Sequence, residues 1–513
     1  MRVLETLTLR RLAMALAVTG LAGCATSALD LAPPAPDQPW QPRLDAAGGI
    51  VPGASTGAAS AYVLPAGAVA LPEPPALTPG HAYTLPELID LAQSSNPLTR
   101  IAWNDARNAA LAAGIAKSVY LPQLTAVAMG GYHEARGSTP TPLGPVSTDT
   151  SGSGTLSALS LQWLLFDFGN QSRVAAASQA SVAANVGFTA AHQQVIYDVS
   201  MAYYAYEAAQ ARTRSALAGL ANADAILVAA RARFRQGAGT VIEVSQAAQN
   251  RAQANLLKVQ SEGTESDSYL ALVSALGISP LSRLTVSGLP ERSLSPALIR
   301  PVEQVVAEAV ARRPDVRAAY ALAKAGTARV EMARSAFMPK VFMSASTAYG
   351  SGRAGITTIP PVGDLSASLS PSGSRHDNGV FMGVTIPLYD GGRRAALLAQ
   401  ARGDADSAAV RLGRVREEAV RQIVVSQNAL RTSLASQEAA QALLEASQTS
   451  YDAAFAAYRH GVGSITDTLR TQNQLLAARS SCADSRSAVL SAAATLALAT
   501  GVIGGEPVTE VMQ

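Results

Sequence analysis

The fold of this chain of 513 residues is decided by a turn that occurs twice: FRQGAGT at 234–240 and YRHGVGS at 458–464. Each copy runs from an aromatic residue and an arginine into Gly-x-Gly, and the two copies lie 224 residues apart. Glycine permits the positive φ that a tight turn requires and lets another backbone come close. Each stretch therefore predicts the end of one helix, a tight turn and the start of a return helix.

Working outward from the turns, four further pairs repeat in the same order. Asn96-Pro97 matches Arg313-Pro314, and SVYLP (118–122) matches SAFMP (335–339), both at an offset of 217. LFDFG (165–169) matches LYDGG (388–392) at 223, and Leu276-Gly277 matches Thr500-Gly501 at 224. The chain is therefore predicted to be two copies of one unit. The change in offset predicts that the length difference lies in one surface loop per copy.

Proline positions separate the helical parts from the rest. Eleven of the 28 prolines lie in residues 1–80, whereas none occurs from Val146 to Ser279 or from Leu388 to Glu506. The proline-free stretches are rich in Ala, Gln, Arg, Leu and Glu, which favour helix. We expect helices over 169–236 and 392–460, each roughly 100 Å long at about 1.5 Å per residue. Such lengths favour a hollow cylinder of helices or a coiled coil.

From Leu85 to Tyr120 the sequence is Ala-rich and helical in pattern, so the first helix of copy one is expected there. Each copy also predicts two strands between its first helix and its long helix. The helical signal stops over 122–132, and apolar and polar residues alternate over 159–165, 341–347 and 380–388. A Gly/Ser/Thr/Pro-rich loop is expected at 133–155 and at 350–378. Strands of about ten residues cross a bilayer when tilted. Ten of the 25 aromatic residues lie in or beside these strands, as the girdles of membrane barrels require. A soluble β-hairpin core remains the alternative.

Four strands cannot close a barrel by themselves. Open strand edges in lipid leave backbone groups unpaired, at several kcal/mol for each group. If the strands cross a membrane, several copies of the chain must share one barrel, and three copies would supply twelve strands.

The first residues predict export from the cytoplasm. Three arginines, at positions 2, 10 and 11, precede a short apolar core, and Leu21-Ala22-Gly23-Cys24 resembles a lipobox. We expect a signal peptide over 1–23, acylation of Cys24, and a Pro/Ala/Gly-rich strap over 24–83. An ordinary secretion signal with a chance cysteine is the alternative. Since Ala25 is not an aspartate, the outer membrane is favoured as the destination.

Composition and motifs argue against several classes of function. A net charge of +3 is too even for a general nucleic-acid binder, and five scattered histidines disfavour a histidine-rich metal site. No Walker, HExxH or CxxC motif occurs, so we expect neither an enzyme nor a resident cofactor. No run of 18 apolar residues occurs, which predicts no helical membrane span in the mature chain.

The duplicated plan, the Asn-Pro and Tyr-Leu-Pro anchors, the LYDGG junction and the paired glycine turns resemble the TolC-type outer-membrane efflux family, and the lipobox resembles its lipoprotein branch. The resemblance divides the chain into repeat 1 (84–280), a linker (281–300), repeat 2 (301–503) and a tail (504–513). It implies a mixed α+β fold, mainly α: a homotrimer with a twelve-stranded outer-membrane β-barrel, four strands from each protomer, continued by a long periplasmic α-helical barrel.

The resemblance also implies a function. It predicts the outer-membrane channel of a tripartite efflux system, a passive duct for drugs or other small solutes, lipid-anchored and extending into the periplasm. Its partners would be a periplasmic membrane-fusion adaptor and an inner-membrane pump of the RND or ABC type. A duct for type I protein secretion has the same fold, and a lipid-anchored coiled coil without a pore is a third possibility.

Two groups of site residues follow from the resemblance. The turns would be tips that contact the adaptor; these residues are Gly237, Ala238, Gly239, Gly461, Val462 and Gly463. Asp467 and Arg470 would lie at the closed periplasmic entrance, where threefold symmetry would gather three Asp467 carboxylates. The protein that typifies the resembled family has aspartates at both matching positions, so Arg470 argues against a purely cation-selective entrance. The alternatives are plain helix termination and a surface ion pair between Asp467 and Arg470.

Overall fold

The computed structural model describes residues 43–44, 50–51, 77–78, 80–141, 144–288, 301–359, 367–369 and 372–504. It divides into two compact units, Met1–Pro74 and Pro75–Gln513. In the first unit β1 (Arg43–Leu44) pairs antiparallel with β2 (Ile50–Val51). The predicted signal peptide, Cys24 and most of the strap lie outside the described residues, as does the tail beyond residue 504. Everything that follows concerns the second unit.

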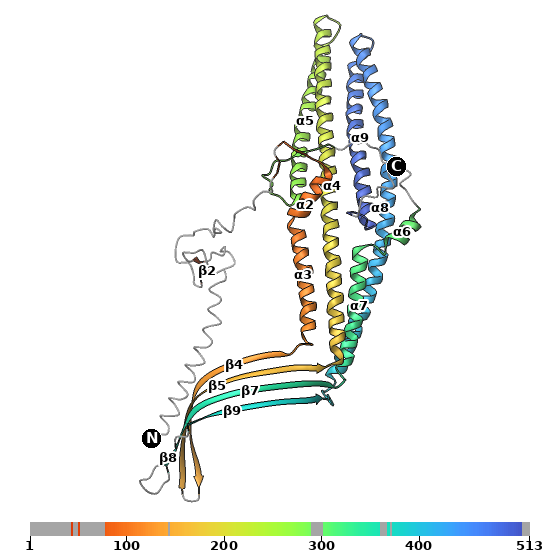
Figure 1. Ribbon diagram of the computed structural model, residues 1–513. Helices are drawn as coiled ribbons and strands as arrows, with labels where there is room; N and C mark the ends of the chain where they lie inside the picture. Colours follow the sequence, from red (N-terminus) through yellow and green to blue (C-terminus); the bar gives the residue numbers. More distant parts are fainter. Residues whose placement is uncertain are drawn as a thin grey trace, which may run out of the picture. The chain divides into compact units, whose positions relative to one another are not determined.

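Two long helical hairpins dominate this unit (Figure 1). The first consists of α4 (Phe168–Arg235) and α5 (Val241–Leu276), and the second of α8 (Arg393–Arg459) and α9 (Ile465–Ala499). α4 has 68 residues and α8 has 67, so the predicted long helices are confirmed to within a residue or two at each end. Each turns into its return helix at the predicted glycines.

Shorter helices precede each hairpin. They are α2 (Leu85–Ser95) and α3 (Pro97–Ser118) in the first repeat, and α6 (Val302–Ala309) and α7 (Pro314–Ser335) in the second. The helical pattern expected over 85–120 breaks at Asn96, whose ψ of 126° is extended. The reason is Pro97, which disfavours helical geometry in the residue before it and can itself begin the next helix.

The repeated anchors meet in space in the same way in both repeats. Asn96 donates from Nδ2 to the carbonyl of Ala275 at 3.0 Å, and Arg313 donates from Nη1 to the carbonyl of Ala499 at 2.7 Å. In each case the residue before a proline satisfies a free carbonyl at the end of the return helix. Gly277 and Gly501, both with φ of 73°, end those helices. The duplication is therefore one of contacts as well as of sequence.

One antiparallel sheet follows the strand order β4–β5–β7–β9. The strands are β4 (Gln123–Thr141), β5 (Gly144–Phe166), β7 (Lys340–Ile359) and β9 (Ser372–Thr385), and the short β8 (Ala367–Leu369) also pairs with β7. Figure 1 shows the four long strands running side by side from the base of the helices. Among the described residues the outer edges of β4 and β9 have no partner strand.

The strands are longer than the sequence pattern predicts. The expected loop at 133–155 is wrong, because β4 and β5 stay in register from Gln123↔Gln162 to Thr141↔Gly144. The loop expected at 350–378 is also largely strand, although 360–366 and 370–371 lie outside the described residues. Gly, Ser and Thr in these stretches form ladder hydrogen bonds without an apolar alternation to reveal them. β9 ends at Thr385 rather than 388, close to Pro387, which has no N–H for the ladder.

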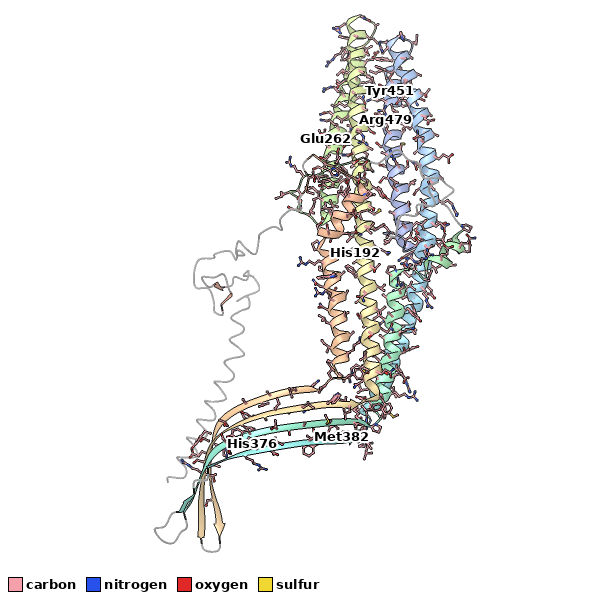
Figure 2. All side chains as sticks on the ribbon, in the orientation of Figure 1. His192, Glu262, His376, Met382, Tyr451 and Arg479 are labelled. Carbon is pink, nitrogen blue, oxygen red and sulfur yellow. The ribbon has the colours of Figure 1, made fainter. Side chains whose placement is uncertain are left out.

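The two faces of the sheet differ in chemistry. One row across all four strands is Leu124–Leu161–Ala345–Val380, and the next residues along the strands supply the opposite row Thr125–Ser160–Ser346–Gly379. Successive side chains point to opposite faces of a sheet, so one face is apolar here and the other is polar or small. Val380 is 75% exposed and Met382, labelled in Figure 2, is 70% exposed. The residues that the structure describes therefore leave this apolar face uncovered.

The helices pack as a bundle around α4, which contacts α3, α5, α7 and α9. Among the described helices α4 alone is long and apolar enough to cross a membrane, although the core helix of a bundle passes the same test. The polar residues Asn170, Ser200 and Thr213 of α4 are buried against its neighbours. From the sequence we expected no helix that could span a membrane, whereas α4 is long and apolar enough to do so. Because its polar residues are buried, we interpret α4 as a core helix of the bundle.

Candidate functional site

The tip turns have the geometry that the glycines predict. Gly237 has φ of 72° and Gly461 has φ of 84°, in the left-handed region that favours glycine. The next residue closes each helix in the same way: Ala238 donates to the carbonyl of Arg233, and Val462 donates to that of Ala457, both at 3.0 Å. Ala238 and Val462 point to the outside, with Val462 85% exposed.

The second glycine of each turn is required for a different reason. A Cβ on Gly239 would lie 3.1 Å from the backbone nitrogen of Phe234, and one on Gly463 would lie 2.9 Å from that of Tyr458. Backbone atoms cannot move aside as a flexible side chain can. Both turns are therefore tightly determined, and each presents three of the six predicted tip residues at the end of its hairpin.

Asp467 and Arg470 lie in the first turns of α9. Ser464 caps this helix, accepting from the backbone N–H of Asp467 at 3.1 Å and donating its own hydroxyl to the Asp467 carboxylate at 2.8 Å. Nη2 of Arg470 lies 3.4 Å from Oδ1 of Asp467, and both side chains are about 60% exposed. Within one chain, Asp467 is thus part of a helix cap and of the surface ion pair that the sequence offered as the alternative.

A contact that the sequence did not predict joins the two hairpins just behind the tips. Arg233 at the end of α4 donates from Nη1 to the carbonyl of Tyr458 on α8 at 2.6 Å, and its guanidinium lies 4.8 Å from the centre of the Tyr458 ring. The Tyr458 hydroxyl in turn donates to Glu243 of α5 at 3.1 Å. We call Arg233, Tyr458 and Glu243 the hairpin latch, because they link α4 and α5 to α8.

The hairpin latch combines the buried phenol of Tyr458 with the charged side chains of Arg233 and Glu243. Tyr458 is only 1% exposed, and this burial raises the pKa of its phenol to about 12, with the Glu243 hydrogen bond acting in the same direction. The phenol therefore stays protonated and remains a donor at physiological pH. A hydrogen bond from a neutral donor to a carboxylate is stronger than one between neutral groups.

The two repeats differ at the latch. Phe234 is the counterpart of Tyr458 in the aligned turns, yet Phe234 is 45% exposed and has no hydroxyl. Only the second repeat can therefore make this hydrogen bond. The signal was present in the alignment as Phe against Tyr, but burial of one ring and exposure of the other depends on packing between residues more than 200 positions apart.

A second link lies deeper between the same hairpins. Gln472 of α9 accepts from Asn250 of α5 at 2.7 Å and donates to the carbonyl of Gly219 of α4 at 3.1 Å. Gln472 is buried, so the loss of either hydrogen bond would leave a polar group with neither a protein partner nor water to bind. Together with the hairpin latch, this amide link holds the tip end of one hairpin against the other.

In the described part of the chain, no group of three or more His, Cys, Asp or Glu side chains could hold a metal ion. Of the buried tyrosines away from the tips, Tyr451 lies on α8 near Arg479 of α9 (Figure 2) and has a pKa raised by burial to about 12. Its ring stacks on Phe455 at 5.8 Å. The hairpin latch and the link through Gln472 are thus contacts that hold helices of different hairpins together.

The family model that matches the chain is described as outer membrane efflux protein and covers residues 88–278 and 305–502, one segment in each repeat. The chain belongs to the outer membrane efflux protein family. One matched segment runs from α2 to α5 and the other from α6 to α9, and the strands of the sheet lie within these segments. The resemblance inferred from the turns and anchors is confirmed, and with it the class of fold and the outer-membrane location.

Relatives in this family match most of the chain. It is 28% identical to Protein CyaE of Bordetella pertussis over 417 residues, which is 80% of this chain and 82% of the relative. It is 27% identical to outer membrane efflux protein BepC of Brucella suis, over 75% of this chain and 78% of the relative.

The solved structure of the outer membrane protein VceC from Vibrio cholerae resembles the chain with a TM-score of 0.65. The two are 20% identical, and the match covers 81% of this chain and 96% of VceC. At this identity the likeness concerns the fold alone. It places the sheet and the helical hairpins of this chain in the architecture of the family.

Proposed function

We propose that the protein is the outer-membrane channel of a tripartite efflux system, through which drugs or other small solutes leave the cell passively. The observation that carries the proposal is the combination of an open four-stranded sheet, apolar on one face, with helical hairpins about 100 Å long. The apolar face of the sheet is suited to contact with a bilayer, and helical hairpins of this length are suited to crossing the periplasm. The family and the name of BepC, an outer membrane efflux protein, support the same function.

The unpaired strands support a trimer. In lipid, the free N–H and C=O groups along β4 and β9 would each cost several kcal/mol. Pairing β9 of one protomer with β4 of the next removes both edges and lets three protomers close a twelve-stranded barrel. The apolar row that contains Leu124 and Val380 would then face lipid, and the row that contains Thr125 and Gly379 would face the lumen.

The partners follow from the two ends of the molecule. The exposed tips, with Ala238 and Val462 at their ends, are the surface that we assign to a periplasmic adaptor, which would connect the channel to an inner-membrane pump of the RND or ABC type. Cys24 is the residue that we expect to carry a covalent lipid in the outer membrane. Export would be driven by the pump, so the channel itself needs no catalytic residue and no cofactor.

The gate of the channel is proposed to lie at the tips. We assign the closed state to the hairpin latch and the amide link, since both must break before α8 and α9 can move away from α4 and α5. Asp467 and Arg470 would line the entrance. In three copies, each Asp467 would bring an adjacent Arg470, so the ring would bind cations less strongly than one of aspartates alone.

Planar-bilayer recordings test the function. Purified full-length protein should be a trimer by native mass spectrometry. In the bilayer it should form a pore whose conductance rises when mutations remove the contacts of the hairpin latch. Asp467→Asn should weaken block of the pore by multivalent cations, because it removes the charge while leaving the backbone cap from Ser464 in place. A trimer that stays non-conducting after latch mutations would favour the pore-less coiled coil, and a stable monomer in native membranes would contradict the barrel.

The duct for type I protein secretion remains the alternative with the same fold. Co-purification with the adaptor and pump separates the two, because an ABC exporter dedicated to a protein substrate would replace the drug pump.

A further inference from the structure

A cavity of about 360 Å³ lies where the sheet gives way to the helices. Its walls come from the first turn of α4, the last turns of α7 and the first turns of α8, with the first residue of β7 beneath them. Both repeats therefore contribute to it. Nothing in the proposed gate or tips involves this cavity.

Basic side chains outnumber acidic ones around the cavity. Four cations line it, namely Arg173, Arg329, Lys340 and Arg394, against the two carboxylates of Asp167 and Asp404.

Two of the four cations already have a carboxylate partner. Nζ of Lys340 lies 2.9 Å from Asp167, and Nε of Arg394 lies 2.7 Å from Asp390. Arg173 and Arg329 are exposed and form no ion pair within 4.0 Å in the part of the chain that the structure describes, although Arg173 is near enough to Asp167 to favour its charged form. Two guanidinium groups are thus available to an anion.

Apart from Ser335 and Gln400, the other side chains that line the cavity are apolar. They are Met332 and Ala333 of α7, Ala336 directly after it, and Leu397 and Ala401 of α8. A free inorganic anion would gain nothing from these side chains and would lose hydration beside them. An anion with an attached hydrocarbon chain would satisfy both the guanidinium groups and the apolar wall.

Exposed aromatic side chains mark the same level of the molecule. Phe166 and Phe168 stand 51% and 47% exposed at the end of β5, and Phe337 and Tyr389 stand 43% and 90% exposed beside the second pair of strands. Aromatic girdles of this kind occur where a membrane barrel meets water. If the sheet crosses the outer membrane as proposed, the cavity lies at the headgroups of the periplasmic leaflet.

We propose that this cavity binds the phosphate headgroup and the adjoining acyl chain of an anionic phospholipid, with Arg173 and Arg329 holding the phosphate. This assignment rests on the proposed function for its position in the membrane, but the chemistry of the cavity stands on the residues around it. Guanidinium groups bind phosphate through paired hydrogen bonds, and basic pockets at membrane interfaces bind anionic headgroups. The same chemistry would suit an amphipathic anion passing through the duct, and the test separates the two sources.

Native mass spectrometry of the full-length protein in detergent tests the site, with dioleoyl-phosphatidylglycerol and dioleoyl-phosphatidylcholine as probes. The wild type should prefer the anionic lipid. The double variant Arg173→Gln/Arg329→Gln should bind phosphatidylglycerol about thirtyfold more weakly, the contribution expected of two basic side chains at an anionic surface, with phosphatidylcholine unchanged.

The matched control is Arg317→Gln/Arg334→Gln, which removes two exposed arginines from α7 that do not line the cavity. The control should keep the wild-type preference; an equal loss in the control, or no loss in Arg173→Gln/Arg329→Gln, overturns the proposal. A shift in the reversal potential of the pore without a change in lipid binding would also overturn it, in favour of an anion in the duct. A protein that keeps the lipid preference but conducts no ions would refute the channel and leave the lipid site standing.

Discussion

Tyr458→Phe is the substitution that tests the proposed gate most directly. It removes one hydroxyl and keeps the ring that packs against the Arg233 guanidinium, so the helix ends should remain in place. The lost bond runs to the Glu243 carboxylate at 3.1 Å. Bonds to charged acceptors contribute about 1.5–3 kcal/mol, but Glu243 is half-buried and can recover water, so we take about 1 kcal/mol for each protomer.

In the proposed trimer, threefold symmetry would multiply this effect. If all three latches must break together for the entrance to open, the closed state loses about 3 kcal/mol, which corresponds to roughly a hundredfold rise in the ratio of open to closed channels. Single-channel recording in planar bilayers measures that ratio as open probability at fixed voltage. We expect the variant to show long open periods under conditions in which the wild type conducts rarely.

Tyr451→Phe is the matched control. Tyr451 lies about two turns earlier on the same helix and is 4% exposed, but its ring stacks within α8 on Phe455, and its hydroxyl forms no hydrogen bond to α4 or α5 among the described residues. Its open probability should stay within about twofold of the wild type. The reasoning fails if Tyr458→Phe conducts like the wild type, or if both variants open equally.

Three further predictions concern the turns, the junction with the sheet and pH. Gly463→Ala should lower the free energy of unfolding by about 2 kcal/mol, because its Cβ meets backbone, whereas Gly237→Ala should cost about 1 kcal/mol from left-handed strain alone; thermal melts followed by circular dichroism compare them. Lys340→Met should cost about 2 kcal/mol in the same melts, since it leaves the Asp167 carboxylate, 4% exposed, without its cation, and Lys340→Arg should restore most of the loss. Hydrogen bonds from the Thr84 backbone and side chain lower the pKa of Glu87 to about 2 from its ordinary 4.5. The ionised Glu87 therefore stabilises the start of α2 fully above pH 4.5, and this stabilisation is lost as the pH falls toward 2. Hydrogen exchange at the start of α2 should show that loss in the wild type and no such pH dependence in Glu87→Gln.

The helices could be predicted from the sequence because their signals are local. Absence of proline set the extent of α4 and α8, and Gly237 and Gly461 set their ends, since only glycine readily adopts the φ found there. The break at Asn96 was missed although Pro97 follows it directly. That error came from weighing the alanine-rich pattern above the restriction that proline places on the residue before it.

The strands and the latch could not be predicted in full, for two different reasons. From 133 to 155 the sequence carries Gly, Ser and Thr on both faces, so its pairing is set by the ladder started at Gln123↔Gln162 and not by any alternation of its own. The partners of Tyr458 lie 215 and 225 positions away in the sequence. The sequence marked the turns at which the hairpins reverse, while the residues that join the two hairpins depend on which helices become neighbours.

The difference between Phe234 and Tyr458 has a consequence for anything that docks onto the tips. In the proposed trimer, duplication alone would give six equivalent ends, whereas the ring of Phe234 is 45% exposed and that of Tyr458 is buried, so alternate ends present different surfaces. A sixfold partner would therefore meet two kinds of socket in alternation, and its subunits would have to bind them with unequal strength.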